Sequence, residues 1–230
     1  MRPRPEERTA LPRRPPLVLF DLDGTLIDSA VGIAEAVNRT LLELGHRRED
    51  PELVRGWIGD GARLLLHRAL AHAGADLPDG PAFDAAYAVL MRHYGDSLPL
   101  QAVAYPGAGE ALRGLRARGV RVALCTNKPE RFIAPLLDAL GWRALFDAIV
   151  GGDTLPERKP SPAPLLHIAG RFGVAPADAL MVGDSQTDAD AARAAGMPLA
   201  LVDYGYHRGL DLHGADAVQV TADLRSLAEA

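Results

Sequence analysis

Acidic residues follow an apolar run near the start of this 230-residue chain. Asp21 and Asp23 come directly after the run 17–20, and one residue separates them. On an extended segment, two residues at this spacing can project to the same side. One carboxylate could then act as a nucleophile while the other serves first as an acid and then as a base. The pair therefore indicates a two-step transfer through a covalent intermediate.

Polar residues that could join this pair follow three later apolar runs. They are Thr126, Asn127 and Lys128 after 120–125, Asp153 and Lys159 after 148–150, and Asp184, Ser185 and Asp188 after 179–182. In an open α/β sheet, ligands bind at the edge where the carboxyl ends of the strands meet. Carboxylates crowded at that edge repel one another, and a hard divalent cation such as Mg²⁺ would relieve the repulsion. Such a site suits a phosphate, to which Thr126 could donate a hydrogen bond and Lys159 a positive charge.

The two lysines are unusual because arginine is the ordinary basic residue of this sequence. The chain has 23 arginines and two lysines, Lys128 and Lys159. Arginine is a wide planar fork, whereas lysine carries a compact charge on a thin stem. We therefore expect a specific role for Lys159. For Lys128, a position near the phosphate and a solvated helix start are both open.

Apolar runs predict the buried parallel strands that would bring these residues together. The runs are 17–20, 120–125, 148–150, 179–182 and 198–202, with a possible edge strand at 217–220. Helical stretches lie between them at 110–118, 129–140, 162–172 and 187–195, and each ends at a glycine suited to a left-handed C-cap. This alternation predicts an α/β fold with a doubly wound parallel sheet.

The region 29–100 has no strand-like run. Apolar residues recur there at helical spacing in 30–44, 62–73 and 81–98. We therefore predict an inserted all-helical cap domain. The predicted division is a disordered tail at 1–16, a catalytic core made of 17–28 and 101–230, and the cap at 29–100.

Composition and charge narrow the function classes. The chain is 48% hydrophobic and 24% charged, which is typical of a globular protein. Its formal net charge of −5 gives no reason to expect a nucleic-acid partner, and no apolar run is long enough to span a membrane. The basic, proline-rich residues 1–16 lack the apolar stretch of a secretory signal. The single cysteine, Cys125, suits a reducing compartment, so we expect a cytoplasmic protein.

Four ordered motifs resemble those of the haloacid dehalogenase superfamily of phosphohydrolases. They are DLDGTLIDS at 21–29, TN at 126–127, KP at 159–160 and GDSQTD at 183–188. The resemblance implies that Asp21 is the nucleophile that takes the phosphoryl group. It implies that Asp23 protonates the leaving oxygen and then activates water.

The resemblance also implies a magnesium site and a phosphate site. The implied residues are Asp21, Asp23 through its backbone carbonyl and Asp184 for magnesium, and Thr126, Asn127 and Lys159 for phosphate. Asp188 would support the metal site or hold a metal-bound water. Lys159 would steady both the phosphate and the nucleophile.

Further segments resemble one branch of this superfamily, the bacterial phosphoglycolate phosphatases. They are GWIGDGA at 56–62, YPG at 105–107, TNKP at 126–129, GGDTLP at 151–156 and YGY at 204–206. The resemblance covers nearly the whole chain except the tail and implies 2-phosphoglycolate as the substrate. The cap loop usually reads Gly-Asn-Gly in this branch, and here it contains Asp60. The candidate substrate-selecting residues are therefore Asp60, Arg63 and Lys128. Arg63 could offset the charge of Asp60.

Other functions are compatible with parts of this pattern. A sugar-phosphate mutase, a pyrophosphatase or a nucleotidase could share every core motif. A receiver-like signalling domain also gathers acids, a hydroxyl and a lysine on a parallel sheet, but it lacks a helical insert and a second acidic cluster. A catalytically silent binding module would not need the intact acidic set. We expect a Mg²⁺-dependent phosphomonoesterase that acts on a small phosphorylated metabolite, as a monomer or homodimer.

Overall fold

The computed structural model describes residues 15–207, 209–212 and 214–229. The predicted tail at 1–16 lies outside these residues except for its last two positions. The backbone N–H of Arg121 donates to the carbonyl of Pro16 at 2.9 Å. Residue 16 therefore already belongs to the hydrogen-bonded sheet.

A six-stranded parallel sheet forms the centre of the described part of the chain, in the order β5-β4-β1-β6-β7-β8. The strands are β1 (Leu17–Phe20), β4 (Arg121–Cys125), β5 (Ala148–Val150), β6 (Ala179–Gly183), β7 (Leu199–Val202) and β8 (Gln219–Thr221). Each predicted run forms a strand, and β8 is the expected edge strand. Because β1 lies between β4 and β6, the chain winds outward from β1 in both directions. The doubly wound α/β fold is confirmed.

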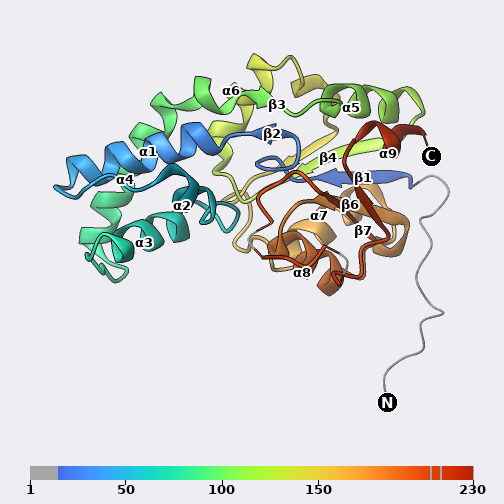
Figure 1. Cartoon of the computed structure of the whole chain (residues 1–230). Helices are drawn as coiled ribbons and strands as arrows, with labels where there is room; N and C mark the ends of the chain where they lie inside the picture. Colours follow the sequence, from blue (N-terminus) through green and yellow to red (C-terminus); the bar gives the residue numbers. More distant parts are fainter. Residues whose placement is uncertain (1–14, 208, 213, 230) are drawn as a thin grey trace.

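Helices cover both faces of this sheet. They are α5 (Ala108–Ala117), α6 (Ile133–Ala139) and α9 (Arg225–Glu229) on one face, and α7 (Ala163–Phe172) and α8 (Gln186–Ala195) on the other. Val18 and Phe20 of β1 belong to the first apolar layer, and Leu17 and Leu19 belong to the second. Figure 1 shows α5 and α9 on the opposite side of the strands from α7 and α8. Burial on both faces explains why the strands are continuous apolar runs.

A helical insert lies between β2 (Ile27–Asp28) and β3 (Val103–Ala104), which pair antiparallel at its base. It contains α1 (Ala30–Glu43), α2 (Pro51–Arg55), α3 (Ala62–His72), α4 (Pro81–Asp96) and the 3₁₀ helix η1 (Leu98–Gln101). Its apolar residues form a cluster separate from the two sheet layers. The insert extends from the end of the sheet at which β1 stops (Figure 1). It corresponds to the predicted cap, whose domain borders stay a prediction.

The structure departs from the expected elements at one helix and at several short segments. The expected helix at 129–140 is a 3₁₀ turn, η2 (Glu130–Phe132), followed by α6. An α-helix that continued through Arg131 would need a backbone N–H at Pro135, which proline lacks. With α6 starting at Ile133, Pro135 falls in the first turn, where no N–H is needed. The short elements α2, β2, β3 and α9 were not predicted, because periodicity cannot be recognised over so few residues.

None of the helices in the described residues combines the length and the apolar character that crossing a membrane requires.

Candidate active site

Asp21 lies just beyond β1 and is buried against an ammonium group. Its Oδ1 is 2.9 Å from Nζ of Lys159, which also donates to Oδ1 of Asp188 at 2.6 Å. Burial raises the pKa of Asp21 to about 6, and the Lys159 charge opposes this rise. Burial alone would lower the pKa of Lys159, but Asp188 and Asp21 raise it above its ordinary value. Lys159 therefore stays charged between the two carboxylates.

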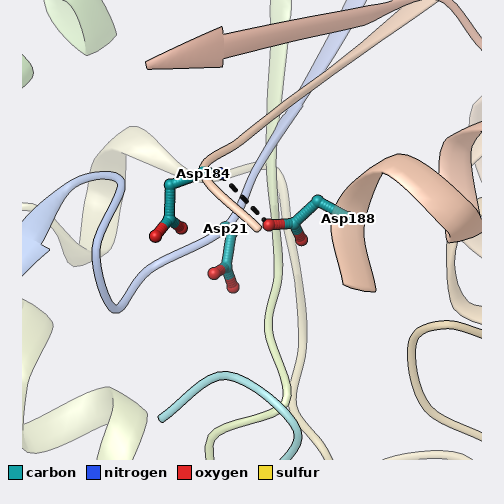
Figure 2. A group of neighbouring side chains, drawn as sticks. All are labelled: Asp21, Asp184 and Asp188. Atoms are coloured by element: carbon teal, nitrogen blue, oxygen red, sulfur yellow. Dashed lines mark hydrogen bonds between the residues drawn. The ribbon is translucent and has the colours of Figure 1, made fainter. Parts of the chain in front are cut away.

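Three buried carboxylates, those of Asp21, Asp184 and Asp188, gather around one point (Figure 2). One oxygen of each lies within 4.8 Å of the others. Burial raises the pKa of Asp184 well above its ordinary range, and the charges of Asp188 and Asp21 add to the rise. Thr25 Oγ1 and the backbone N–H of Tyr206 donate to the two oxygens of Asp184 at 2.9 and 2.7 Å. These bonds fix the orientation of the Asp184 carboxylate.

This cluster fits a divalent cation. Crowded buried carboxylates repel one another, and oxygen ligands of this kind suit Mg²⁺. The backbone closes in on the cluster, because a Cβ at Gly24 would lie 2.3 Å from Oδ2 of Asp184. The carboxylates of Asp21, Asp184 and Asp188 are thus able to hold such an ion together. The expected metal ligands included Asp23, through its backbone carbonyl, whereas Asp188 was expected to support them. Metal binding by the Asp23 carbonyl stays a prediction.

Asp188 is held by the first turn of α8. Its Oδ2 accepts hydrogen bonds from the backbone N–H groups of Asp184 and Ser185 at 3.2 and 3.1 Å, and from Ser185 Oγ at 2.7 Å. The first of these bonds is drawn in Figure 2. Ser185 in return accepts from the N–H of Asp188, which completes a capping box. The same carboxylate therefore caps a helix and holds Lys159.

The second acid of the pair has different partners. Oδ1 of Asp23 accepts from Ser29 Oγ at 2.6 Å and from Lys128 Nζ at 3.0 Å. The Lys128 side chain is 0% exposed, so the solvated helix start, one of the two alternatives left open, is wrong. Its Nζ also donates to Tyr94 Oη at 3.0 Å and to Gln101 Oε1 at 2.8 Å. Burial lowers the pKa of Lys128, and Asp23 opposes that change.

Thr126 and Asn127 follow β4 and line the same cavity as the acidic pair. Oγ1 of Thr126 accepts from the backbone N–H of Lys128 at 3.2 Å. Nδ2 of Asn127 donates to the carbonyls of Gly59 and Lys159 at 3.0 and 2.8 Å. The sequence led us to expect phosphate binding from both residues. The side-chain amide of Asn127 joins the loop of the insert to the loop that carries Lys159, and phosphate binding by both residues stays a prediction.

The cavity between these residues and the insert measures about 20 Å³. Polar residues of the core line one side, and Ile33, Ile58 and Leu65 of the insert form an apolar wall on the other. A cavity of this size holds about one water molecule. The insert therefore leaves little space beside the acidic pair in this structure.

The insert residues proposed for substrate selection contact other side chains. Arg63 forms ion pairs with Asp79 at 2.6 Å and Asp84 at 3.1 Å. Asp60 accepts from Arg68 at 2.6 Å and from Thr187 at 2.5 Å. Arg68, and not Arg63, therefore offsets the charge of Asp60.

Several residues that hold the site were not among the predicted site residues. They are Thr25, Ser29, Tyr94, Gln101, Thr187 and Tyr206. The segments that carry the family resemblance contain Thr25, Ser29, Thr187 and Tyr206. The resemblance could therefore have indicated these four residues. Tyr94 has the spacing of a helix-packing residue, and Gln101 follows no recognisable pattern.

Known proteins resemble this chain over most of its length. The curated phosphoglycolate phosphatase of Pseudomonas putida is 48% identical over 215 residues, which cover 93% of this chain and 78% of that protein. Phosphoglycolate phosphatase 1 of Pseudomonas aeruginosa is 47% identical over 218 residues, covering 94% and 79%. A crystal structure described as a predicted phosphoglycolate phosphatase from Haemophilus somnus has a TM-score of 0.86 and 34% identity, and covers 93% of this chain and 96% of its own.

The family assignment agrees with these relatives and with the four ordered motifs. Residues 15–196 match the haloacid dehalogenase-like hydrolase family, and this range contains the acidic cluster, both lysines and the whole insert. The resemblance seen in the sequence is therefore confirmed. The chain belongs to the haloacid dehalogenase-like hydrolase family and is an enzyme of the hydrolase class.

Proposed function

We propose that this chain is a Mg²⁺-dependent phosphomonoesterase that hydrolyses 2-phosphoglycolate to glycolate and phosphate. The observation that carries the proposal is the different environment of the two acids after β1. Asp21 is paired with Lys159 inside the acidic cluster, whereas Asp23 is paired with Lys128 and Ser29. Two carboxylates held apart in this way can take the separate roles of nucleophile and acid–base. The names of the relatives at 48% and 47% identity support the substrate.

In the proposed first step, a carboxylate oxygen of Asp21 attacks the phosphorus atom. The bond from phosphorus to the ester oxygen breaks, and Asp23 gives its proton to the leaving alkoxide. Lys159, 2.9 Å from Asp21, would balance negative charge on the nucleophile and the phosphoryl group. The products of this step are glycolate and a phosphorylated Asp21.

In the proposed second step, water attacks the phosphorus atom of phosphorylated Asp21. Asp23, now ionised, takes a proton from that water, and the bond from phosphorus to the Asp21 oxygen breaks. Inorganic phosphate leaves and both carboxyl groups return to their starting states. Mg²⁺, held by the cluster of Asp21, Asp184 and Asp188, would supply positive charge that draws the phosphate in.

The cavity supports a small substrate. A volume of about 20 Å³ cannot contain a phosphate monoester, so the insert would open for entry and close over the bound molecule. A large leaving group would meet the apolar wall of Ile33, Ile58 and Leu65 on closure. This arrangement favours a two-carbon acid over a nucleotide. We also propose that the enzyme acts on this metabolite in the cytoplasm, as a monomer or homodimer.

The test is phosphate release from a panel of phosphorylated metabolites with Mg²⁺. It includes 2-phosphoglycolate, sugar phosphates, nucleotides and pyrophosphate, so that a nucleotidase or pyrophosphatase activity would be seen; a mutase would convert a sugar phosphate without releasing phosphate. We expect the highest kcat/KM for 2-phosphoglycolate and a loss of at least about 10²-fold in Asp21→Asn, whose amide is a poor nucleophile. Preference for another substrate would overturn the assignment to 2-phosphoglycolate. A long-lived phosphorylated protein without turnover would favour the receiver-like alternative.

A further inference from the structure

Lys128 is a buried ammonium group whose hydrogen-bonding capacity is fully used. An ammonium group has three hydrogens to donate. Nζ of Lys128 contacts Asp23 at 3.0 Å, Tyr94 Oη at 3.0 Å and Gln101 Oε1 at 2.8 Å, and its side chain is 0% exposed. These three acceptors account for its three hydrogens. A substrate anion could bind Lys128 only by displacing one of them.

The two acceptors from the insert are themselves fixed. Nε2 of Gln101 donates to Ser97 Oγ at 2.7 Å, which directs Oε1 of Gln101 toward the ammonium. The ring of Tyr94 stacks on Phe132 with centroids 5.0 Å apart, and Nζ of Lys128 lies 4.8 Å from the Tyr94 centroid. The ammonium therefore sits at a defined place, set by side chains of the insert.

From this geometry we propose that Lys128 is a positioning residue that holds the carboxylate of Asp23 in place for proton transfer. The inference rests on the proposed function, in which Asp23 is the acid and base. Because two of the three acceptors belong to the insert, the placement of Asp23 depends on the insert being closed. The acid is thus fully positioned only when the insert is closed against the core. This role differs from direct selection of the substrate by Lys128.

The leaving group of the substrate separates these roles. The alkoxides of 2-phosphoglycolate and ethyl phosphate need a proton to leave, whereas the acetate of acetyl phosphate does not. The kcat/KM value covers the steps up to departure of the leaving group. For Lys128→Met we expect kcat/KM to fall by about 10²-fold for both alkyl esters, and by less than about tenfold for acetyl phosphate. Methionine keeps the length of the side chain and removes the charge.

A milder pair of variants provides a second test if Lys128→Met fails to fold. Tyr94→Phe removes one acceptor from Lys128 and keeps the stacked ring. We expect the same substrate pattern with a loss of up to about tenfold. Tyr87→Phe, a hydroxyl removal on the same helix away from Lys128, is the matched control and should resemble the wild type.

Each other outcome contradicts the proposal. An equal loss for all three substrates would mean a general structural or phosphate-binding role. A loss confined to 2-phosphoglycolate would mean that Lys128 binds the carboxylate of the substrate. Unchanged values in Lys128→Met, or in Tyr94→Phe where the first variant is unfolded, would remove the positioning role. A wild type that releases phosphate from none of the three substrates would instead overturn the proposed function.

Discussion

The hydroxyl of Thr187 donates a 2.5 Å hydrogen bond to Oδ1 of Asp60, and this bond joins the sheet core to the helical insert. Thr187 lies in the first turn of α8, where a nearby negative charge is favoured by the helix dipole. Oδ2 of Asp60 is held by Arg68 at 2.6 Å, so both oxygens of the carboxylate have partners. The hydrogen bond between Thr187 and Asp60 holds the loop 59–61 near the acidic cluster that contains Asp188.

We predict that Asp60→Asn loosens this loop. Asparagine is neutral, so its oxygen forms a weaker hydrogen bond with Arg68, and its NH₂ group can only donate to the Thr187 hydroxyl, which makes that bond neutral as well. Losing the charge from these hydrogen bonds corresponds to a roughly fivefold or greater change in a local opening equilibrium, about 1 kcal/mol or more. Hydrogen exchange of the backbone amides of residues 57–62 measures this change.

Arg63→Gln is the matched control for the loop experiment. Arg63 lies near the start of the same helix, α3, but its ion pairs are with Asp79 and Asp84 on the surface of the insert. Exchange in 57–62 should therefore equal that of the wild type. If Asp60→Asn exchanges no faster than Arg63→Gln, the Thr187 bond does not hold the loop.

Asp21→Asn is predicted to stabilise the metal-free protein at neutral pH. Because the pKa of Asp21 is raised from 3.8 to about 6, its ionised form is disfavoured in the folded state. A group whose pKa is raised on folding stabilises the folded state at pH values below its pKa in the unfolded chain. This stabilisation is lost as the pH rises through its pKa in the folded protein. An asparagine resembles the protonated acid, so the variant should gain up to ~3 kcal/mol at pH 7.5 and little at pH 4. Urea unfolding in EDTA at several pH values measures the difference.

The exposed acid Asp138 supplies the control for this stability series. Its side chain is 55% exposed and pairs with Arg143 at the surface. We expect Asp138→Asn to follow the wild type at every pH. A metal-free Asp21→Asn protein that is less stable than the wild type at pH 7.5 would show that the ion pair with Lys159 outweighs the cost of burial.

The strand-end residues of the site could be predicted because their positions are set by local sequence. Asp21, Lys159 and Asp184 each follow an apolar run, and parallel strands bring their carboxyl ends to one edge. The same reasoning did not predict the strand order, because β1 pairs with β4 on one side and with β6 on the other, and both strands follow it far along the chain. The α/β class followed from alternation, whereas the pairing depends on the packing of the helices.

Contacts between the insert and the core could not be read from the sequence. Thr187 and Asp60 are 127 positions apart, and neither residue alone indicates the other. The sequence led us to name Arg63 as the residue that could offset the charge of Asp60. The rotation of α3 instead turns Arg68 toward Asp60 and Arg63 toward Asp79. Such pairings depend on tertiary packing, which periodicity does not report.

We predict that Mg²⁺ stabilises the folded protein through the acidic cluster. An ion that binds the folded state alone raises the free energy of unfolding, by about 2.7 kcal/mol at a hundred times its Kd. Thermal unfolding of the wild type with and without Mg²⁺ should show this increase, and EDTA should abolish both the increase and phosphate release. Asp184→Asn should reduce the response to Mg²⁺, and Asp138→Asn should not. An equal Mg²⁺ response in Asp184→Asn and the wild type would exclude Asp184 as a ligand.

The Cys125 thiol is predicted to be inert in the folded protein and to make stability fall at alkaline pH. It ends β4 with 1% exposure, and burial raises its pKa from 9.0 to about 12. The folded state therefore keeps the thiol proton at a pH where the unfolded chain loses it, so stability present below pH 9 declines as the pH rises. Relative to Cys125→Ala, the wild type should lose ~1.4 kcal/mol between pH 8 and pH 10 in urea unfolding. Rapid reaction of the native thiol with a disulfide reagent at pH 8, at the rate seen in denaturant, would contradict this assignment.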